Sequence, residues 1–332
     1  MSFNLDDIPK IDLCLLPTPI IPLNRLSNYL EGPRIYMKRD DLTGIAFGGN
    51  KNRKLEYLLA DALQLGADTI ITEGAVNSNH CLQTAACALK LGFDCELVLS
   101  GKEPSEITGN FLLFKILEIP VHFVNNSSER KNCMREREKK LISKGKKPYL
   151  IPTGGSNALG ALGYIKCILE VKQQVQQFNG KFNYFVHAAG SGGTQAGLLI
   201  GKELFYPELR IVSVTVGIDA SYLETETAKI LKEFQSKFDI KQDLTRIPIK
   251  LVTGYEGPGY GLPSKEMVET VKLVAQLEGV FLDPVYNGKA MVGLIDMIKS
   301  GNFSEDEKIL FLHSGGGSSI FNYNDAFSKH SP

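Results

Sequence analysis

Three features that mark specialised classes of protein are scarce or missing in this chain: net charge, a long apolar run and paired cysteines. The 332 residues contain 37 Lys+Arg and 37 Asp+Glu, and a net charge near zero argues against a general binder of nucleic acid or anionic membranes. No stretch approaches the length of a membrane span, and the start carries no basic segment followed by an apolar run, so we expect no signal peptide. We therefore predict a cytoplasmic protein whose partners are neither nucleic acid nor membrane.

The cysteines indicate a reducing environment rather than a disulfide framework. None of the six forms a Cys-x-x-Cys pair, so we expect free, buried thiols. His80 and Cys81 are neighbours, but adjacent residues on a helix point apart, and we expect no metal site. The cysteines are Cys14, Cys81, Cys87, Cys95, Cys133 and Cys167.

Short apolar segments alternate with amphipathic ones along most of the chain. This alternation predicts an α/β protein with parallel sheets, in which ligands bind outside the carboxyl ends of the strands. Residues 1–33 are expected to be irregular. The predicted strands are 34–39, 69–72, 95–99, 121–124, 149–151, 184–188, 211–216, 280–282 and 309–313. The predicted helices are 52–66, 81–91, 106–117, 128–144, 159–178, 222–238, 265–278 and 289–299.

One stretch, Gly48 to Tyr57, combines a turn with a lysine at the start of a helix. Its glycines and asparagine favour a turn, and apolar residues at helical spacing follow directly. Lys51 at such a junction is partly desolvated, and the like charge of Lys54 on the same face acts in the same direction, so we expect a lowered pKa. A neutral amine is what condensation with a carbonyl needs, on a substrate or on pyridoxal phosphate (PLP). The alternative is a solvated basic helix start.

The loop from Gly190 to Gly197 runs from a predicted strand into a predicted helix. Its backbone amides favour an anion, and Ser191 and Thr194 add hydroxyl donors. It lacks the Gly-Lys-Ser/Thr of a Walker loop, and Gln195 occupies the third glycine position of a dinucleotide fingerprint. A lone phosphate fits best. Because Asp219 could mimic a ribose-binding acid, a nicotinamide-dependent dehydrogenase stays as an alternative, as does a glycine turn without a ligand.

Other loops carry polar side chains at strand ends. The segment from Asn77 to His80 is either an ordinary helix cap or a cradle for a substrate carboxylate. Tyr260 and Tyr286 lie in loops rich in glycine and proline, where they either fill space or stack on a planar cofactor and share a proton. Ser314 could meet the nitrogen of a heterocycle. We expect the histidines 187 and 313 to be structural.

Together these segments resemble one family. Residues 38–42, 46–56, 77–80 and 283–286 look like the D-cysteine desulfhydrase / 1-aminocyclopropane-1-carboxylate (ACC) deaminase family. Its members are PLP enzymes of the tryptophan-synthase-β-like fold, and the resemblance runs in collinear order over nearly the whole chain. It implies PLP fold type II, with two parallel-sheet α/β domains, the cofactor in the cleft between them, and a homodimer. Residues 51–160 would form the small inserted domain, and residues 1–50 with 161–332 the large PLP-binding domain.

The resemblance also implies a role for each site residue. Lys51 would be the Schiff-base lysine, Asn79 would bond the phenolic oxygen of the cofactor, and Ser78, with Asn77 beside it, would bind the substrate carboxylate. The PLP phosphate would be held by Gly190, Ser191, Gly192, Gly193 and Thr194, together with Lys54. Tyr260 and Tyr286 would flank the ring and the substrate, and Ser314 would face the pyridine nitrogen.

Two positions separate the branches of this family. ACC deaminases look like Tyr-Glu-Gly after Asp-Pro-Val, with leucine before the late glycines, whereas D-cysteine desulfhydrases carry threonine at both places. This chain has Asn287 and Ser314, so Ser314 is closer to the desulfhydrases and Asn287 matches neither branch. We predict a lyase that eliminates sulfide from a small D-amino acid, D-cysteine, and yields pyruvate and ammonia. Lys51 or a neighbouring tyrosine would remove the α-proton. The alternatives are ACC deamination and elimination from β-chloro-D-alanine or D-serine.

Overall fold

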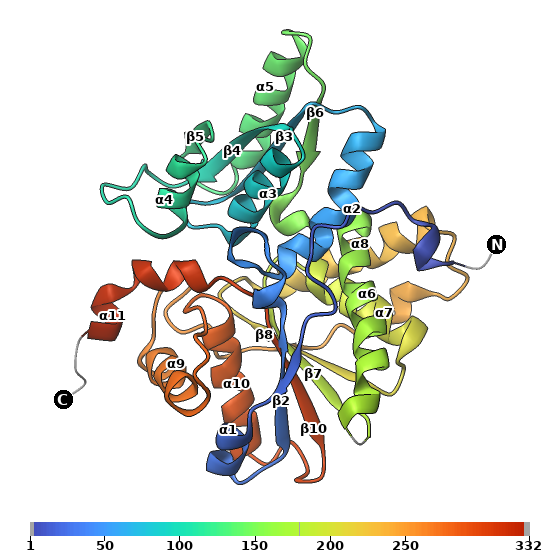
Figure 1. The fold of residues 1–332 in the computed structure, drawn as a ribbon, viewed down its shortest axis with the longest axis vertical. Helices are drawn as coiled ribbons and strands as arrows, with labels where there is room; N and C mark the ends of the chain where they lie inside the picture. Colours follow the sequence, from blue (N-terminus) through green and yellow to red (C-terminus); the bar gives the residue numbers. More distant parts are fainter. Residues whose placement is uncertain (1–2, 179, 329–332) are drawn as a thin grey trace.

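The computed structural model describes residues 3–178 and 180–328, and within them the strands form two sheets (Figure 1). The larger sheet has the order β1-β2-β10-β7-β8-β9, and the smaller has the order β5-β4-β3-β6. Neighbouring strands are parallel except β1 and β2, so the predicted α/β class is confirmed. The strands are β1 (Ile20–Pro22), β2 (Arg34–Arg39), β3 (Thr69–Ala75), β4 (Asp94–Ser100), β5 (Val121–Val124), β6 (Pro148–Ile151), β7 (Tyr184–Ala189), β8 (Arg210–Thr215), β9 (Leu251–Val252) and β10 (Lys308–His313).

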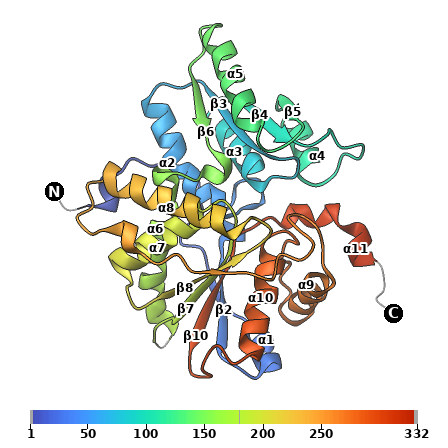
Figure 2. The same cartoon turned by 180° about the vertical axis from the view of Figure 1, so that it is seen from behind.

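Helices cover both faces of the larger sheet (Figures 1 and 2). Successive side chains of a strand point to opposite faces. Accordingly, Ile35 and Phe311 pack in a core with α1, α9 and α10, whereas Tyr36 and Leu310 pack on the other face with α6 and α7. These helices are α1 (Asn24–Leu30), α6 (Ala158–Gln174), α7 (Gly193–Phe205), α9 (Lys265–Glu278) and α10 (Asn287–Lys299), and α8 (Ala220–Lys237) packs beyond them against α6 and α7. The short α11 (Asn324–Ser328) follows near the C-terminal end.

The smaller sheet is covered in the same way. Ile70 of β3 packs in a core with α2, α3 and α4, and its neighbour Ile71 packs with Met134 of α5 on the opposite face. These helices are α2 (Asn50–Gln64), α3 (Asn79–Lys90), α4 (Gly109–Ile116) and α5 (Arg130–Ile142). All strands of this sheet lie within residues 69–151, and those of the larger sheet lie outside that range. The boundaries predicted for the inserted domain, 51 and 160, stay a prediction.

Three parts of the predicted secondary structure were wrong. Residues 280–282 form no strand. Val280 and Leu282 are buried against α9 and α10, and this burial accounts for their apolar side chains without any pairing in a sheet. The last strand of the larger sheet is instead the two-residue β9, which is too short to leave a periodic pattern. Residues 1–33, expected to be irregular, contain β1 and α1. None of the helices described is long and apolar enough to cross a membrane.

Candidate active site

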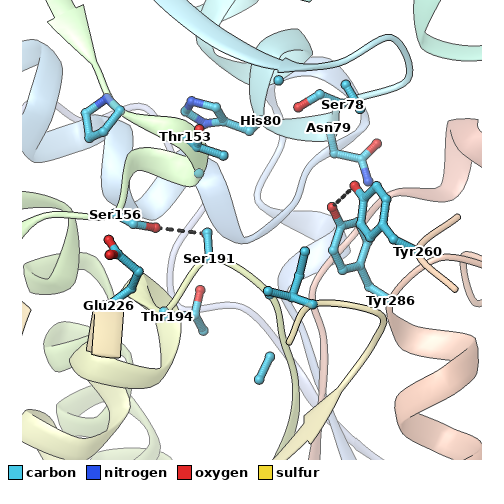
Figure 3. Close-up of a pocket in the computed structure, with 18 of the residues that line it drawn as sticks. Ser78, Asn79, His80, Thr153, Ser156, Ser191, Thr194, Glu226, Tyr260 and Tyr286 are labelled. Carbon is cyan, nitrogen blue, oxygen red and sulfur yellow. Dashed lines mark hydrogen bonds between the residues drawn. The ribbon is translucent and has the colours of Figure 1, made fainter. Parts of the chain in front are cut away.

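A cavity of about 520 Å³ lies at the carboxyl ends of strands from both sheets (Figure 3). Residues of its wall lie at or just after the carboxyl ends of β3, β4, β6, β7, β8 and β10, as expected for a ligand site in parallel sheets. The wall includes most of the predicted site residues: Lys51, Ser78, Asn79, Gly190, Ser191, Gly192, Thr194, Tyr260, Tyr286 and Ser314.

Lys51 lies in the first turn of α2, and the preceding glycine explains why the helix starts there. Gly49 has a φ of 135°, and a side chain at this position would come within 2.5 Å of the Gln83 amide. The Oε1 atom of Gln83 accepts hydrogen bonds from the backbone N–H groups of Lys51 and Asn52, at 3.1 and 3.2 Å, and so caps the helix. The Nζ atom of Lys51 donates to the Oδ1 atom of Asn50 at 2.9 Å and is thereby aimed along the cavity wall.

Burial lowers the pKa of Lys51 to about 8, and the negative charge of Asp283 opposes this effect. The lowering expected from burial is therefore confirmed, whereas the like charge of Lys54 is not among its causes. The repulsion instead acts on Lys54, whose pKa is lowered well below its usual value by burial and then by Lys51. A substantial neutral fraction of Lys51 near physiological pH makes its amine a nucleophile for a carbonyl.

The glycine-rich loop and Lys54 together fit a phosphate group. Helix α7 begins at Gly193 behind Gly192, whose φ is 81°, and no side chain caps its first amides. A side chain at Gly193 would come within 2.7 Å of the Ser156 hydroxyl and 3.0 Å of Lys54 Nζ, so this bare position brings the amides beside the Lys54 amine. Lys54 is fully buried and donates to the Gly154 carbonyl at 3.0 Å, and no carboxylate in the described part of the chain pairs with it. A phosphate at this cradle would supply a negative charge that favours the protonated form of Lys54.

Hydroxyl groups surround this cradle. Ser156 donates to Ser191 at 2.8 Å, as Figure 3 shows, and the Nδ2 atom of Asn50 donates to the Thr194 hydroxyl at 3.1 Å. The second bond connects the residue beside Lys51 directly to the cradle. The lysine and the phosphate position are thus held at a fixed separation, which a cofactor attached at one end and bound at the other requires.

The Ser78–Asn79 turn presents donors to the same cavity. Ser78 caps α3, and its hydroxyl accepts from the Cys81 amide at 3.2 Å. The Oδ1 atom of Asn79 accepts from Asn110 Nδ2 at 2.7 Å, so its Nδ2 atom is the free end of that amide. This donor lies beside Gly316, where an added side chain would come within 2.6 Å of it. The arrangement suits an oxygen acceptor on a planar ligand, as the resemblance implied for Asn79.

Tyr260 and Tyr286 lie next to each other in the cavity wall. Their hydroxyl oxygens lie 2.6 Å apart, and the rings meet edge to face with centroids 6.0 Å apart (Figure 3). Burial, and then the neighbouring Tyr260, raise the pKa of Tyr286 well above its usual value. Both hydroxyl groups therefore stay protonated at neutral pH. One hydroxyl proton is used in the hydrogen bond between the two tyrosines, and the other can be donated to a ligand.

Ser314 is oriented by a buried amide and a buried carboxylate. The Nδ2 atom of Asn287 donates to Asp283 and, at 2.8 Å, to the Gly315 carbonyl, which directs its Oδ1 atom toward Ser314. That oxygen accepts from the Ser314 amide at 2.9 Å and from its hydroxyl at 3.1 Å. Ser314 is thus the residue of this group that lines the cavity, and the buried amide of Asn287 and the buried carboxylate of Asp283 lie behind it.

Some residues lie where the sequence did not place them. Asn77 is exposed, and neither Asn77, Lys54 nor Gly193 belongs to the described wall of the cavity, although Lys54 and Gly193 lie directly behind it. Hydrogen bonds occupy both ring nitrogens of His187 and of His313, which agrees with the structural roles expected for them, although His187 also lines the cavity. Polar wall residues that we missed include Glu73, Ser100, Arg130, Thr153, Ser156, Gln195 and Glu226. Glu73, Ser100 and Thr153 lie at strand ends, so the strand-end rule, applied to every strand, would have found them.

Comparison with known proteins gives long, nearly full-length similarity. The D-cysteine desulfhydrase of Serratia proteamaculans is 43% identical over 325 residues, covering 96% of this chain and 97% of the relative. That of Yersinia pseudotuberculosis is 42% identical over 328 residues, covering 97% and 98%. A crystal structure of an ACC deaminase homologue has a TM-score of 0.89 and 40% identity, and covers 98% of this chain and 97% of its own.

More distant structures share the fold alone. A PLP-dependent aspartate racemase, 17% identical, has a TM-score of 0.65 and covers 90% of each chain. Residues 11–315 match the family described as pyridoxal-phosphate dependent enzyme. The match, the relatives and the phosphate cradle beside Lys51 agree, and they confirm both the predicted fold and the predicted cofactor. The chain therefore belongs to the pyridoxal-phosphate-dependent enzymes, in the group that contains the D-cysteine desulfhydrases and the ACC deaminase homologue.

Proposed function

We propose that this protein is a lyase that converts D-cysteine into pyruvate, sulfide and ammonia. The observation that carries the proposal is the Lys51 amine, with its pKa of about 8, in one cavity with a phosphate cradle and the Ser78–Asn79 turn. Such a site suits an α-amino acid that reacts at its α-carbon. D-cysteine is favoured over other amino acids because the relatives with 43% and 42% identity are named for that activity.

Each residue of the site has a separate role in the elimination. Bound PLP supplies an electron sink for the negative charge that develops at the α-carbon. Ser78 and Asn79 bind and orient the amino acid. Lys51, whose pKa of about 8 leaves about half of the amine neutral near pH 8, takes the α-proton. The C–S bond then breaks, and sulfur leaves with the bonding electron pair.

The tyrosines act at the leaving group. Because Tyr286 keeps its proton and shares a hydrogen bond with Tyr260, the pair can donate a proton to the departing sulfur. The remaining aminoacrylate reacts with water to give pyruvate and ammonia, so no oxidant or reductant is required. Tyr260 or Tyr286 as the base for the α-proton is less well supported, since a phenol with a raised pKa is rarely deprotonated at neutral pH.

Asn287 and Ser314 favour elimination over ACC deamination. An acid beside the ring nitrogen would favour a protonated pyridine and a stronger electron sink, whereas an amide and a hydroxyl suit a modest one. ACC deamination is the second candidate because of the structural similarity to the ACC deaminase homologue. β-Chloro-D-alanine and D-serine remain further candidate substrates. Membership of the PLP family removes the nicotinamide-dependent alternative.

The decisive experiment compares two substrates with one batch of PLP-loaded protein. We expect pyruvate and sulfide from D-cysteine and no 2-oxobutyrate from ACC. Lys51→Ala should abolish both products, and the exposed Lys102→Ala should behave as the wild type. Release of 2-oxobutyrate from ACC alone, or elimination that survives in Lys51→Ala, would refute the proposal.

We further propose a cytoplasmic homodimer in which residues 51–160 fold as an inserted domain. All six cysteines are free thiols, and most are buried, which suits a reducing compartment. The dimer rests on the family resemblance. Sedimentation of the PLP-loaded protein at several concentrations tests the dimer, and limited proteolysis near the two boundaries tests the domain.

A further inference from the structure

Arg130, the first residue of α5, lies on the wall of the cavity and has no role in the site described so far. It shares that wall with Ser78 and Asn79, and its side chain is only 16% exposed. A guanidinium group with so little contact with water needs hydrogen-bond acceptors or a counter-ion.

The partners of Arg130 are incomplete. Among the described residues, its Nε atom donates to the Ser127 carbonyl at 3.3 Å and lies 3.7 Å from the Oε2 atom of Glu73, which is too far for a hydrogen bond. That Oε2 atom is buried without any hydrogen-bond partner, while Oε1 of the same carboxylate accepts from Thr153 at 2.7 Å. The fork of terminal N–H donors is therefore free to bind another oxygen pair.

Arg130 is placed beside the substrate side of the cavity. Glu73 is followed by Gly74, where an added side chain would come within 2.6 Å of the Ser78 hydroxyl, so the carboxylate that attracts Arg130 adjoins the Ser78 turn. The charge of Arg130 also lowers the pKa of Tyr260, against the larger effect of burial, which raises it. Arg130 thus lies on the same cavity wall as Ser78 and Tyr260 and close enough to Tyr260 for its charge to act on that hydroxyl group.

We propose that Arg130 binds the α-carboxylate of the amino acid substrate, together with the Ser78–Asn79 turn. The inference rests on the proposed function to the extent that the substrate is an α-amino acid. An Arg–carboxylate pair can form two parallel charge-assisted hydrogen bonds, which are stronger than those from Ser78 and Asn79 alone. The charge of Glu73 keeps the guanidinium near the cavity, and the terminal N–H groups of Arg130 then form hydrogen bonds with the substrate carboxylate.

The test measures ligand binding to the PLP-loaded protein by its absorbance change, with two small amines. D-Alanine carries the carboxylate but no leaving group, and 2-aminoethanethiol carries the thiol but no carboxylate. We expect Arg130→Gln to weaken D-alanine binding about 10- to 100-fold and to change 2-aminoethanethiol binding less than about twofold. Arg130→Lys should recover part of the loss. Arg135→Gln, an exposed arginine of the same helix, is the matched control and should bind both amines as the wild type does.

Three outcomes would overturn the proposal: equal weakening of both amines, no weakening of either, or the same loss in Arg135→Gln. Glu73→Gln provides an independent variant, because it removes the competing carboxylate and should leave D-alanine binding equal or tighter. A loss as large as in Arg130→Gln would instead show that the two residues form a structural clamp. If the wild type binds D-alanine through Arg130 but does not release sulfide from D-cysteine, the proposed function fails and this inference stands.

Discussion

At the scale of single residues, burial sets the reactivity of Lys51. Its pKa falls from 10.5 to about 8, so the neutral fraction of the amine rises as the pH passes through about 8. We expect the rate of PLP attachment to the apoprotein to rise over the same range and to level off above it. Absorbance after mixing apoprotein and PLP, followed from about pH 6.5 to about 10, measures this rate. A rate that still climbs steeply at the upper end would mean that Lys51 titrates as an exposed lysine.

A second residue-scale prediction concerns Asn110, which fixes the orientation of Asn79. Its Nδ2 atom donates to Asn79 Oδ1 at 2.7 Å and to the Asn77 carbonyl at 2.8 Å, and its own Oδ1 accepts from Ser318 at 2.7 Å. Asn110→Leu should lower kcat/KM for D-cysteine about 10-fold, because the Asn79 amide can then rotate. Lys51 should still bind PLP, as absorbance will show. Ser318→Ala, one bond further away, should have the smaller effect, and the reverse order would contradict the assignment.

At the scale of elements, glycines let α6 pass close to α2. A side chain at Gly163 would come within 2.5 Å of the Arg53 carbonyl and 2.8 Å of the Lys54 amide, both backbone atoms of the turn that carries Lys51. Gly163→Ala must therefore displace α2, at a cost of about 1–3 kcal/mol in the free energy of unfolding. We also expect weaker PLP binding. Urea unfolding and PLP titration measure the two effects, with the partly exposed Lys166→Ala on the same helix as the control. Lower stability with unchanged PLP affinity would mean that α2 does not move.

At the scale of the whole molecule, the sequence predicts those features that depend on residues close together in the chain. The Gly-Gly-Asn turn before Lys51 and the glycine loop at 190–193 were readable because turn chemistry and strand ends are local signals. Asn110 and Arg130 were not, since their importance comes from contacts with Asn79 and Glu73, which are distant in sequence. For the same reason, the loop at 280–282, in which Val280 and Leu282 are buried and Phe281 is exposed, was mistaken for a strand.

A buried ionic network that the sequence did not predict connects α2, α6 and the end of β2. Arg53 of α2 donates to both oxygens of Asp40, each at 2.8 Å, and to Glu170 of α6 at 2.9 Å. Lys38 of β2 pairs with the same Glu170, and Tyr164 donates to Asp40 at 2.6 Å. The network therefore connects the helix that carries Lys51 to β2 of the larger sheet and to α6, with every charge opposed by another.

Because these charges are buried, removal of one should cost far more than the loss of a surface pair. We expect Asp40→Asn to lower the free energy of unfolding by about 3–5 kcal/mol, since Arg53 keeps its charge and loses its two-oxygen partner. Burial alone would raise the pKa of Asp40, but Arg53 holds it below its usual value. The stabilisation is thus present above the usual carboxyl pKa and is lost as the pH falls through the lowered one. Urea unfolding of the PLP-loaded protein at neutral and acid pH should show a smaller loss on acidification in Asp40→Asn than in the wild type. Asp12→Asn, from an exposed pair with Lys10, should change little, and an equal effect of the two variants would rule out this role for the network.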